Sequence, residues 1–255
     1  MEFVKMEGLG NDFVVIQGPL QPTSDDVRRW CDRRRGIGAD GVLVVTAVDE
    51  HKVAMEYWNA DGSAAEMCGN GLRCVAKYSL DRGLVSGPEL EVLTEAGLRR
   101  VVVGPQAVRA ELGPVQAEGG SVELAGYDLA TVSVGNPHAV TFVEDCYAVP
   151  VQAVGPVVEG DPRYPDRTNV EFATVIAPDR IALRVWERGV GETLACGTGA
   201  AAAVAEGERS GRTGSSVTVV LPGGELLVEI VEGTAWIEGP ARAVFAGLLE
   251  AELPD

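Results

Sequence analysis

Two cysteines stand in closely similar, glycine-rich surroundings. Cys68 lies in the segment NADGSAAEMCGNGLRC, and Cys196 lies in ERGVGETLACGTGAAAA. In both segments the glycines after the cysteine lead into residues that favour a helix, so each thiol is expected at a helix start. N–H groups and the positive end of the helix dipole then lie beside each sulfur. We therefore expect a lowered thiol pKa at both sites and a place for an acidic ligand beside a reactive sulfur.

The two segments belong to an internal duplication. At an offset of 128 residues and without a gap, Trp58 aligns with Trp186, Asn59 with Glu187, and the first cysteine with the second. In the same order, VSVGNPHAV mirrors GLGNDFVVI, and RTNVEFATV stands where GIGADGVLVV stood. A period of about half the chain is too long for a solenoid, so two similar domains are predicted.

Each half is rich in predicted strands and has one helix that follows its cysteine. The fold class expected is α+β, with two pseudo-symmetric domains, each a barrel-like β-sheet around a central α-helix. The domains expected are residues 1–112 with a C-terminal tail at about 242–255, and residues 113–241. The tail, AVFAGLLEAEL, is expected to return to the first domain as a strand or a helix. Ser24-Asp25-Asp26 is predicted to supply the N-cap and an acidic first turn of a smaller helix, Val27 to Arg34, which is closed by Gly36.

Composition restricts the kinds of partner. The 255 residues, 46% hydrophobic and 23% charged, are enough for one large or two medium soluble domains. A net charge of −17 and only three lysines argue against nucleic acid. The chain has five cysteines without a C-x-x-C pair, no signal-peptide pattern, and no apolar stretch that could span a membrane. We expect a cytoplasmic protein with reduced thiols and no membrane association.

Two equivalent thiols suit inversion at a carbon centre. A pseudo-twofold axis would bring equivalent points of two domains together at their interface, where clefts form. One thiolate would then remove a proton from one face of a carbon while the opposite thiol delivers a proton to the other face. The hydrogen next to an amino-acid carboxylate is very weakly acidic, so the site would need preorganised N–H donors and exclusion of water. Gly69-Asn70 and Gly197-Thr198 are candidates for those donors.

Other uses of the cysteines fit less well. A zinc site would need clustered Cys and His, but the only histidines are His51 and His138, so no metal is expected. A thiol hydrolase that uses His138 would leave one cysteine loop without a role. Pyridoxal phosphate needs a lysine in a suitable loop, and no glycine-rich loop has one, which favours chemistry without a cofactor. A protein in which the two cysteines form a reversible disulfide without turnover remains an alternative.

Across nearly the whole chain the sequence closely resembles the diaminopimelate epimerase family. The motifs that carry the resemblance are GNDFVV, GIGADG, NADGSAAEMCGNG, GNPHAV, RTNVEF and ERGVGETLACGTG, in the family's order. Proline racemases share the two-cysteine fold but lack the NADGS run and the ERG approach. Racemisation of another amino acid on the same scaffold is therefore the second enzymatic hypothesis.

The resemblance implies cofactor-independent interconversion of LL- and meso-2,6-diaminopimelate in lysine and peptidoglycan precursor synthesis, and a chain that is often a homodimer. It makes Cys68 and Cys196 the two catalytic acid/base residues, with His138 and Glu187 beside the thiols as supporting groups. The remaining implied substrate contacts are Asn11, Asn59, Gly69, Asn70, Asn136, Asn169, Glu187, Arg188, Gly197 and Thr198. Arg188 is expected to bind the distal carboxylate.

Several of these residues also have an ordinary structural interpretation. Asn11, Asn59 and Asn136 lie on predicted turns, where asparagine commonly bonds its own backbone. His138 precedes an apolar run and is compatible with a core position. Only their joint placement in the duplicated pattern favours a functional role.

Overall fold

The computed structural model describes residues 1–65 and 67–249. The chain forms two compact units, Met1–Ala110 together with the C-terminal residues from Gly239, and Glu111–Glu238. Glu66, and residues 250–255 of the predicted C-terminal tail, lie outside the described residues. No helix among the described residues is long and apolar enough to cross a membrane.

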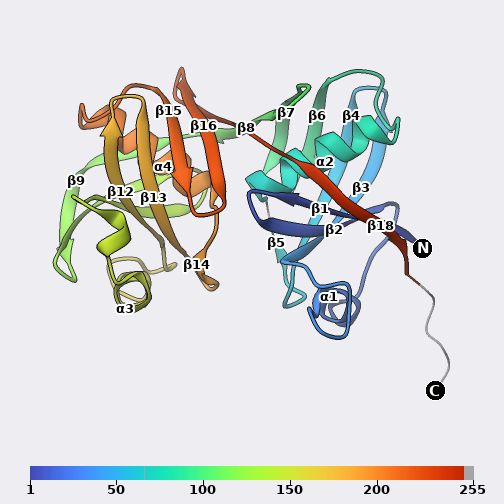
Figure 1. Cartoon of the computed structure of the whole chain (residues 1–255), viewed down its shortest axis with the longest axis horizontal. Coiled ribbons are helices and arrows are strands. Elements are labelled where there is room, and N and C mark those ends of the chain that lie inside the picture. The colour runs from blue at the N-terminus through green and yellow to red at the C-terminus, as the bar shows by residue number, and fades with distance from the viewer. Residues whose placement is uncertain (66, 250–255) are drawn as a thin grey trace. The chain divides into compact units, whose positions relative to one another are not determined.

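The first unit is a sheet that curls around one helix (Figure 1). In spatial order its strands are β18 (Arg242–Leu248), β1 (Glu2–Gly8), β2 (Asn11–Gln17), β3 (Gly41–Asp49), β4 (Lys52–Asn59), β6 (Glu89–Thr94), β7 (Gly97–Val103) and the first part of β8 (Val108–Pro114), which continues beyond Ala110 into the second unit. The short β5 (Ala64–Ala65) adds to β4. Helix α2 (Gly69–Asp81) packs against β1, β2, β3, β4, β6, β7 and β18, whereas α1 (Ser24–Cys31) contacts β3.

The second unit repeats this arrangement. In spatial order its strands are β9 (Gln116–Leu124), β10 (Tyr127–Ser133), β11 (Pro137–Phe142), β12 (Asn169–Ala177), β13 (Arg180–Glu187), β15 (Ser216–Leu221), β16 (Gly224–Val231) and β17 (Thr234–Gly239). The short β14 (Gly191–Thr193) adds to β13. Helix α4 (Gly197–Arg209) packs against β9, β10, β11, β12, β15 and β16. A 3-10 turn (Cys146–Ala148) and α3 (Val151–Glu159) contact the strands β12 and β13.

The strand registers of the two units are equivalent, as the sequence duplication predicts. In the antiparallel pair β3–β4, Val42 is opposite Trp58, and in the pair β12–β13, Val170 is opposite Trp186. The parallel pairs also recur, since β2–β3 and β4–β6 correspond to β11–β12 and β13–β15. The predicted fold class, two similar halves each with a barrel-like sheet around a central helix, is confirmed.

The composition of the two central helices explains why a sheet can close around them. Ala200–Ala203 in α4 are fully buried small side chains, which let surrounding strands approach the helix axis. Helix α2 is likewise buried on several sides, through Leu72, Cys74 and Val75. Cys74 is a core residue, and burial raises the pKa of its thiol to about 12.

The predicted bounds of the first helix are wrong. Helix α1 begins at Ser24, because Thr23 is the N-cap: Thr23 Oγ1 accepts from the Asp26 N–H, and the Asp26 carboxylate accepts from the Thr23 N–H. The predicted acidic first turn, with Asp25 and Asp26, is confirmed. The helix ends at Cys31 because the Asp32 carboxylate accepts from the N–H groups of Arg34 and Arg35 and holds them in a turn.

The returning C-terminal segment is a strand, so the helical alternative is wrong for its described part. Strand β18 pairs antiparallel with β1, with Glu2 opposite Leu248, and the two lie side by side in Figure 1.

Candidate active site

In the first unit, Cys68 is the N-cap residue of α2, as the glycines around it predict. Its side chain is half-buried, and its Sγ lies 3.6 Å from Asn11 Oδ1. Asn70, in the first turn of the helix, donates from Nδ2 to the same Asn11 oxygen at 3.2 Å. Sequence positions 11, 68 and 70 are therefore brought together within this unit.

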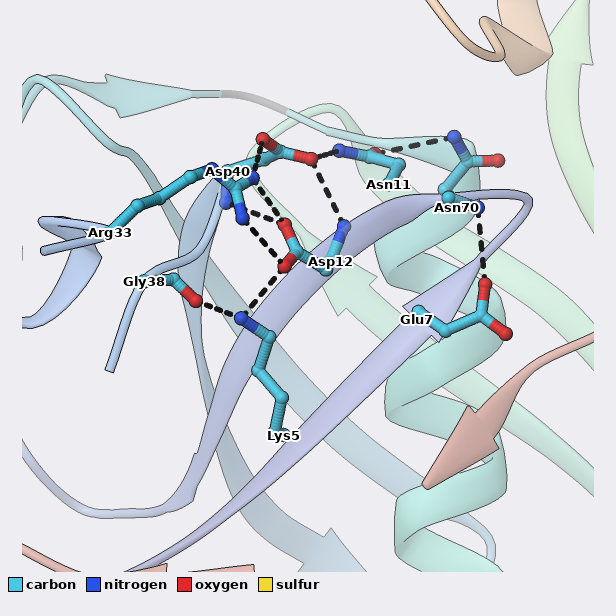
Figure 2. Close-up of polar contacts among 9 residues, drawn as sticks. Lys5, Glu7, Asn11, Asp12, Arg33, Gly38, Asp40 and Asn70 are labelled. Carbon is cyan, nitrogen blue, oxygen red and sulfur yellow. Dashed lines mark hydrogen bonds and ion pairs between the residues drawn. The ribbon is translucent and has the colours of Figure 1, made fainter. Parts of the chain in front are cut away.

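The direction of the Asn11 amide is set by Asp40, just before β3 (Figure 2). Asn11 Nδ2 donates to Asp40 Oδ2 at 2.8 Å, and the Asp12 N–H donates to the same oxygen at 3.1 Å. With its NH2 group committed to a carboxylate, Asn11 can present only its oxygen to the thiol. The S–H of Cys68 is therefore the donor in that contact.

Asp40 is itself part of a charged cluster. Arg33 donates to both oxygens of Asp12 and to Asp40 Oδ1, and the buried Lys5 lies 2.7 Å from Asp12 Oδ2 (Figure 2). Burial opposes ionisation of Asp12, but the bonds from Arg33 and Lys5 outweigh it and lower the pKa of Asp12 to about 2. The cluster ties β1, β2 and the segment before β3 together beneath Asn11.

Asn70 is oriented from the other side by Arg73. This arginine is fully buried, and its guanidinium donates to Asn70 Oδ1 at 2.9 Å and to the carbonyls of Gly69 and Pro240 at 3.3 Å. Because Asn70 Oδ1 accepts from the guanidinium, Nδ2 is directed to Asn11. Burial lowers the pKa of Arg73.

In the second unit, Cys196 is the N-cap residue of α4 and is buried. Its Sγ accepts from the Gly199 N–H at 3.4 Å and lies 3.4 Å from Thr198 Oγ1. Thr198 Oγ1 in turn accepts from Asn136 Nδ2 at 3.4 Å. Asn136, Cys196 and Thr198 are therefore brought together in this unit, but Asn136 is linked to the sulfur through Thr198, whereas Asn11 contacts the Cys68 sulfur directly.

Behind Asn136 lies a buried histidine–carboxylate pair. His138 Nε2 is 3.0 Å from Asn136 Oδ1, and His138 Nδ1 is 2.8 Å from Glu171 Oε1. Both side chains of the pair are fully buried. His138 thus has a core position, as its sequence context allowed, and also belongs to the hydrogen-bonded chain that leads to Cys196.

The segment before Cys196 is fixed by Asn169. Its Nδ2 donates to the Pro137 carbonyl at 2.9 Å, and its Oδ1 accepts from the Arg188 N–H at 3.0 Å. The Arg188 side chain is exposed, and its guanidinium donates to the Asp166 carbonyl at 2.9 Å. The carboxylate of Glu187 accepts from Thr193 Oγ1, and burial raises the pKa of Glu187.

The expected lowering of the thiol pKa is wrong for Cys196. Burial raises its pKa well above the usual value, and the negative charges of Glu187 and Glu171 raise it further. Hydrogen bonds from Thr198 and the Gly199 N–H act in the opposite direction but are outweighed. Burial and the two carboxylates therefore favour the protonated form of the Cys196 thiol.

Asn59 has a local role here. Its Nδ2 donates to Ser63 Oγ at 3.0 Å, and its N–H donates to the Ser63 carbonyl at 2.8 Å. These bonds close the turn between β4 and β5, as asparagine commonly does.

Three charged residues that contact this network were not found from the sequence. Arg73 and Glu171 each lie in otherwise apolar runs, and Asp40 lies in a glycine-rich turn where acidic residues are common. Alignment of the two halves could have indicated Glu171, because this charged residue aligns with the apolar Leu43 of a predicted strand. Among residues 1–65 and 67–249, no group of three or more His, Cys, Asp and Glu side chains has an arrangement that could hold a metal ion.

The fold of this chain is shared with proteins of known structure. The solved structure of a hydroxyproline epimerase from Agrobacterium vitis superimposes with a TM-score of 0.76 at 18% identity, over 97% of this chain and 91% of that one. A sequence profile described as diaminopimelate epimerase matches residues 3–118 and 130–244.

The chain belongs to the diaminopimelate epimerase family. It is 46% identical to the diaminopimelate epimerase of Desulforudis audaxviator and 43% identical to that of Moorella thermoacetica, in each case over 97% of this chain and 98% of the relative.

Proposed function

We propose that this protein interconverts LL- and meso-2,6-diaminopimelate without a cofactor, in lysine and peptidoglycan precursor synthesis. Family membership over nearly the full chain supports the substrate. The observation that carries the chemistry is the repeated placement of a cysteine as the N-cap of the central helix, Cys68 in one unit and Cys196 in the other.

In the proposed mechanism the two thiols are the acid and the base. In one direction the Cys68 thiolate removes the α-proton of the substrate, and the Cys196 thiol delivers a proton to the opposite face. The roles exchange in the reverse direction. The raised pKa of Cys196 suits the direction in which this residue is the acid, because the proton stays on sulfur until a carbanion forms.

The negative charge that develops on the substrate needs stabilisation. We assign the α-carboxylate to the backbone of Gly69-Asn70 and Gly197-Thr198, at the positive ends of α2 and α4. Asn11 and Asn136 each lie within the hydrogen-bonded network around a thiol. We assign the rest of the substrate to these two residues together with Asn59, Asn169, Glu187 and Arg188, with Arg188 on the distal carboxylate.

The test is exchange of the α-hydrogen with solvent. Reduced protein incubated with LL-diaminopimelate in deuterated water is expected to produce meso product that carries deuterium at the inverted carbon. Cys68→Ser and Cys196→Ser are each expected to abolish turnover, whereas Cys146→Ala removes a thiol outside the site and serves as a control. Lack of deuterium in the product disproves the function, and turnover that survives both single serine substitutions disproves the two-base mechanism. Proline and histidine in the same assay test the second enzymatic hypothesis.

We also propose a cytoplasmic homodimer. Strand β18 supports this proposal because it presents a row of exposed apolar side chains, with Val244 57% and Leu248 72% exposed. Sedimentation of the wild-type protein is expected to give the mass of two chains, and Val244→Glu is expected to weaken the dimer. If sedimentation gives the mass of one chain for the wild-type protein, the dimer proposal is wrong.

A further inference from the structure

Glu171 is an unusual residue for the centre of a buried strand. It lies on β12 between apolar neighbours, is fully buried, and has one oxygen bonded to His138 Nδ1. Its other oxygen, Oε2, has no hydrogen-bond partner among the described residues. A buried carboxylate costs free energy even when it is paired, so its presence calls for a physical reason.

The duplicated unit shows that the fold does not require this carboxylate. The parallel pair β2–β3 has Phe13 opposite Gly41, and the parallel pair β11–β12 has His138 opposite Asn169. In these equivalent registers, Phe13 corresponds to His138, and Leu43 corresponds to Glu171. Phe13 and Leu43 are both fully buried. One unit therefore fills these two positions with an apolar pair, and the other fills them with a histidine–carboxylate pair.

The histidine–carboxylate pair is connected to the thiol by side chains alone. Asn136 Nδ2 is used toward Thr198, so its oxygen faces His138 Nε2 and requires a proton on that nitrogen. The opposite ring nitrogen faces Glu171 Oε1, and one more proton is shared between these two atoms. Because Thr198 Oγ1 contacts Cys196 Sγ, the chain runs without a break from Glu171 to the sulfur.

The carboxylate also lies against the start of α4. A Cβ atom on Gly199 would be only 2.7 Å from Glu171 Oε1, so the absence of a side chain at Gly199 is what admits the carboxylate. Helix starts favour negative charge, which partly offsets the cost of burial. A Cβ atom on the equivalent glycine of the first unit, Gly71, would lie 3.2 Å from Leu43 Cδ2.

We propose that Glu171 is a positioning residue for epimerisation: it fixes the imidazole of His138 and, through Asn136 and Thr198, sets the direction of the hydroxyl that contacts Cys196. This inference rests on the proposed role of Cys196. In the first unit, Leu43 occupies the position equivalent to Glu171. The proposed positioning by a carboxylate therefore acts on Cys196 and not on Cys68.

Three variants separate positioning from packing. Glu171→Gln keeps the size of the side chain and leaves an amide oxygen as a weaker acceptor for His138 Nδ1. This variant is expected to lower kcat about 10-fold with little change in KM. Glu171→Leu removes the acceptor, and is expected to lower kcat about 100-fold. The double variant His138→Phe with Glu171→Leu copies the apolar pair of the first unit, and is expected to regain thermal stability relative to Glu171→Leu without regaining activity. Glu206→Gln removes another buried carboxylate, which pairs with Arg209 near the other end of α4, and is the matched control.

A second readout does not depend on turnover. The chain has only two histidines, so protein labelled with 15N-histidine gives two sets of imidazole signals, and His51→Gln assigns them. At a fixed pH near neutrality, the His138 nitrogens of the wild-type protein are expected to show the pattern set by the Glu171 and Asn136 contacts, and Glu171→Gln is expected to change that pattern. Unchanged His138 nitrogen shifts in Glu171→Gln, or full activity in the double variant, overturn the proposal.

The two levels of inference fail separately. If Cys196→Ser retains turnover, the role of Cys196 is wrong, whereas the histidine spectra still report whether Glu171 controls His138. If Cys196→Ser is inactive but Glu171→Leu keeps the wild-type kcat, the positioning role alone is wrong.

Discussion

Asp40 holds the side-chain amide of Asn11 in one of its two orientations, by accepting from Nδ2 at 2.8 Å. The orientation matters because the amide oxygen is then the atom that meets the Cys68 sulfur at 3.6 Å. A flipped amide would place an NH2 group there, which cannot accept the thiol proton.

Asp40→Ala is expected to lower kcat/KM about 10-fold, because Asn11 loses the acceptor that selects its orientation. Steady-state kinetics in both reaction directions measure the effect. Arg33→Ala removes a neighbouring charge without touching the Asn11 amide, and is expected to have a smaller effect. Equal losses in the two variants would mean that the charged cluster as a whole, rather than the bond to Asn11, is what matters.

The ion pairs of Asp12 predict a specific pH dependence of stability. Its pKa is lowered to about 2, so the folded state binds a proton less readily than the unfolded chain does. The resulting stabilisation, about 2 kcal/mol, is present above pH 4 and is lost as the pH falls through 2. Asp12→Asn is expected to lower the free energy of unfolding by about this amount at pH 7, and the difference from wild type is expected to shrink between pH 4 and 2. Urea titrations across this range give the curve, and a constant difference down to pH 2 contradicts the assignment.

Two glycine substitutions provide a comparison between the units. Both Gly71 and Gly199 are helical, so alanine at either position gains about 1 kcal/mol of helix propensity. At Gly71 the new methyl group meets the flexible end of Leu43, whereas at Gly199 it meets a carboxylate held by His138. Gly199→Ala is expected to destabilise the protein by about 1 to 3 kcal/mol, and Gly71→Ala is expected to be nearly neutral. Thermal unfolding measures the stability of each variant relative to wild type. Equal stabilities of the two variants would show that the Glu171 carboxylate moves aside freely.

Alkylation measures the electrostatic environment of Cys196. Glu187→Gln removes one of the negative charges that raise the pKa of this thiol, so iodoacetamide modification of Cys196 is expected to begin at lower pH than in wild type. Peptide mapping by mass spectrometry separates the five cysteines, and Cys74, whose pKa burial raises to about 12, is expected to stay unmodified in the folded protein. A profile for Cys196 that is identical in the two proteins argues against a charge interaction with Glu187.

The duplication made most of the fold readable from the sequence. Aligning the cysteine loops at one offset predicted two sheets around two helices, and the opposition of Val42 with Trp58 and of Val170 with Trp186 repeats that alignment. Helix bounds were harder, because the end of α1 depends on the side chain of Asp32 bonding two particular N–H groups. Composition and spacing carry no such information.

The sequence predicted the site residues that lie in recognisable motifs, but it did not predict the buried residues that orient them. Asn11, Asn136 and both cysteines occur in glycine-rich motifs with recognisable chemistry. Glu171 occurs inside a strand, and only the structure shows that its carboxylate is buried beside His138. The pKa of Cys196 is raised, whereas a helix start was expected to lower it. Burial and the two carboxylates have a larger effect on this pKa than the N–H groups have.

The pairing of β1 with β18 links the two ends of the described chain, since Glu2 lies opposite Leu248. During synthesis on a ribosome, the second unit is complete in one contiguous stretch, Glu111–Glu238, as soon as that stretch has emerged. The first unit must wait with the edge of β1 uncovered until the final strand is translated. The half of the protein that is made first is therefore the half that finishes folding last.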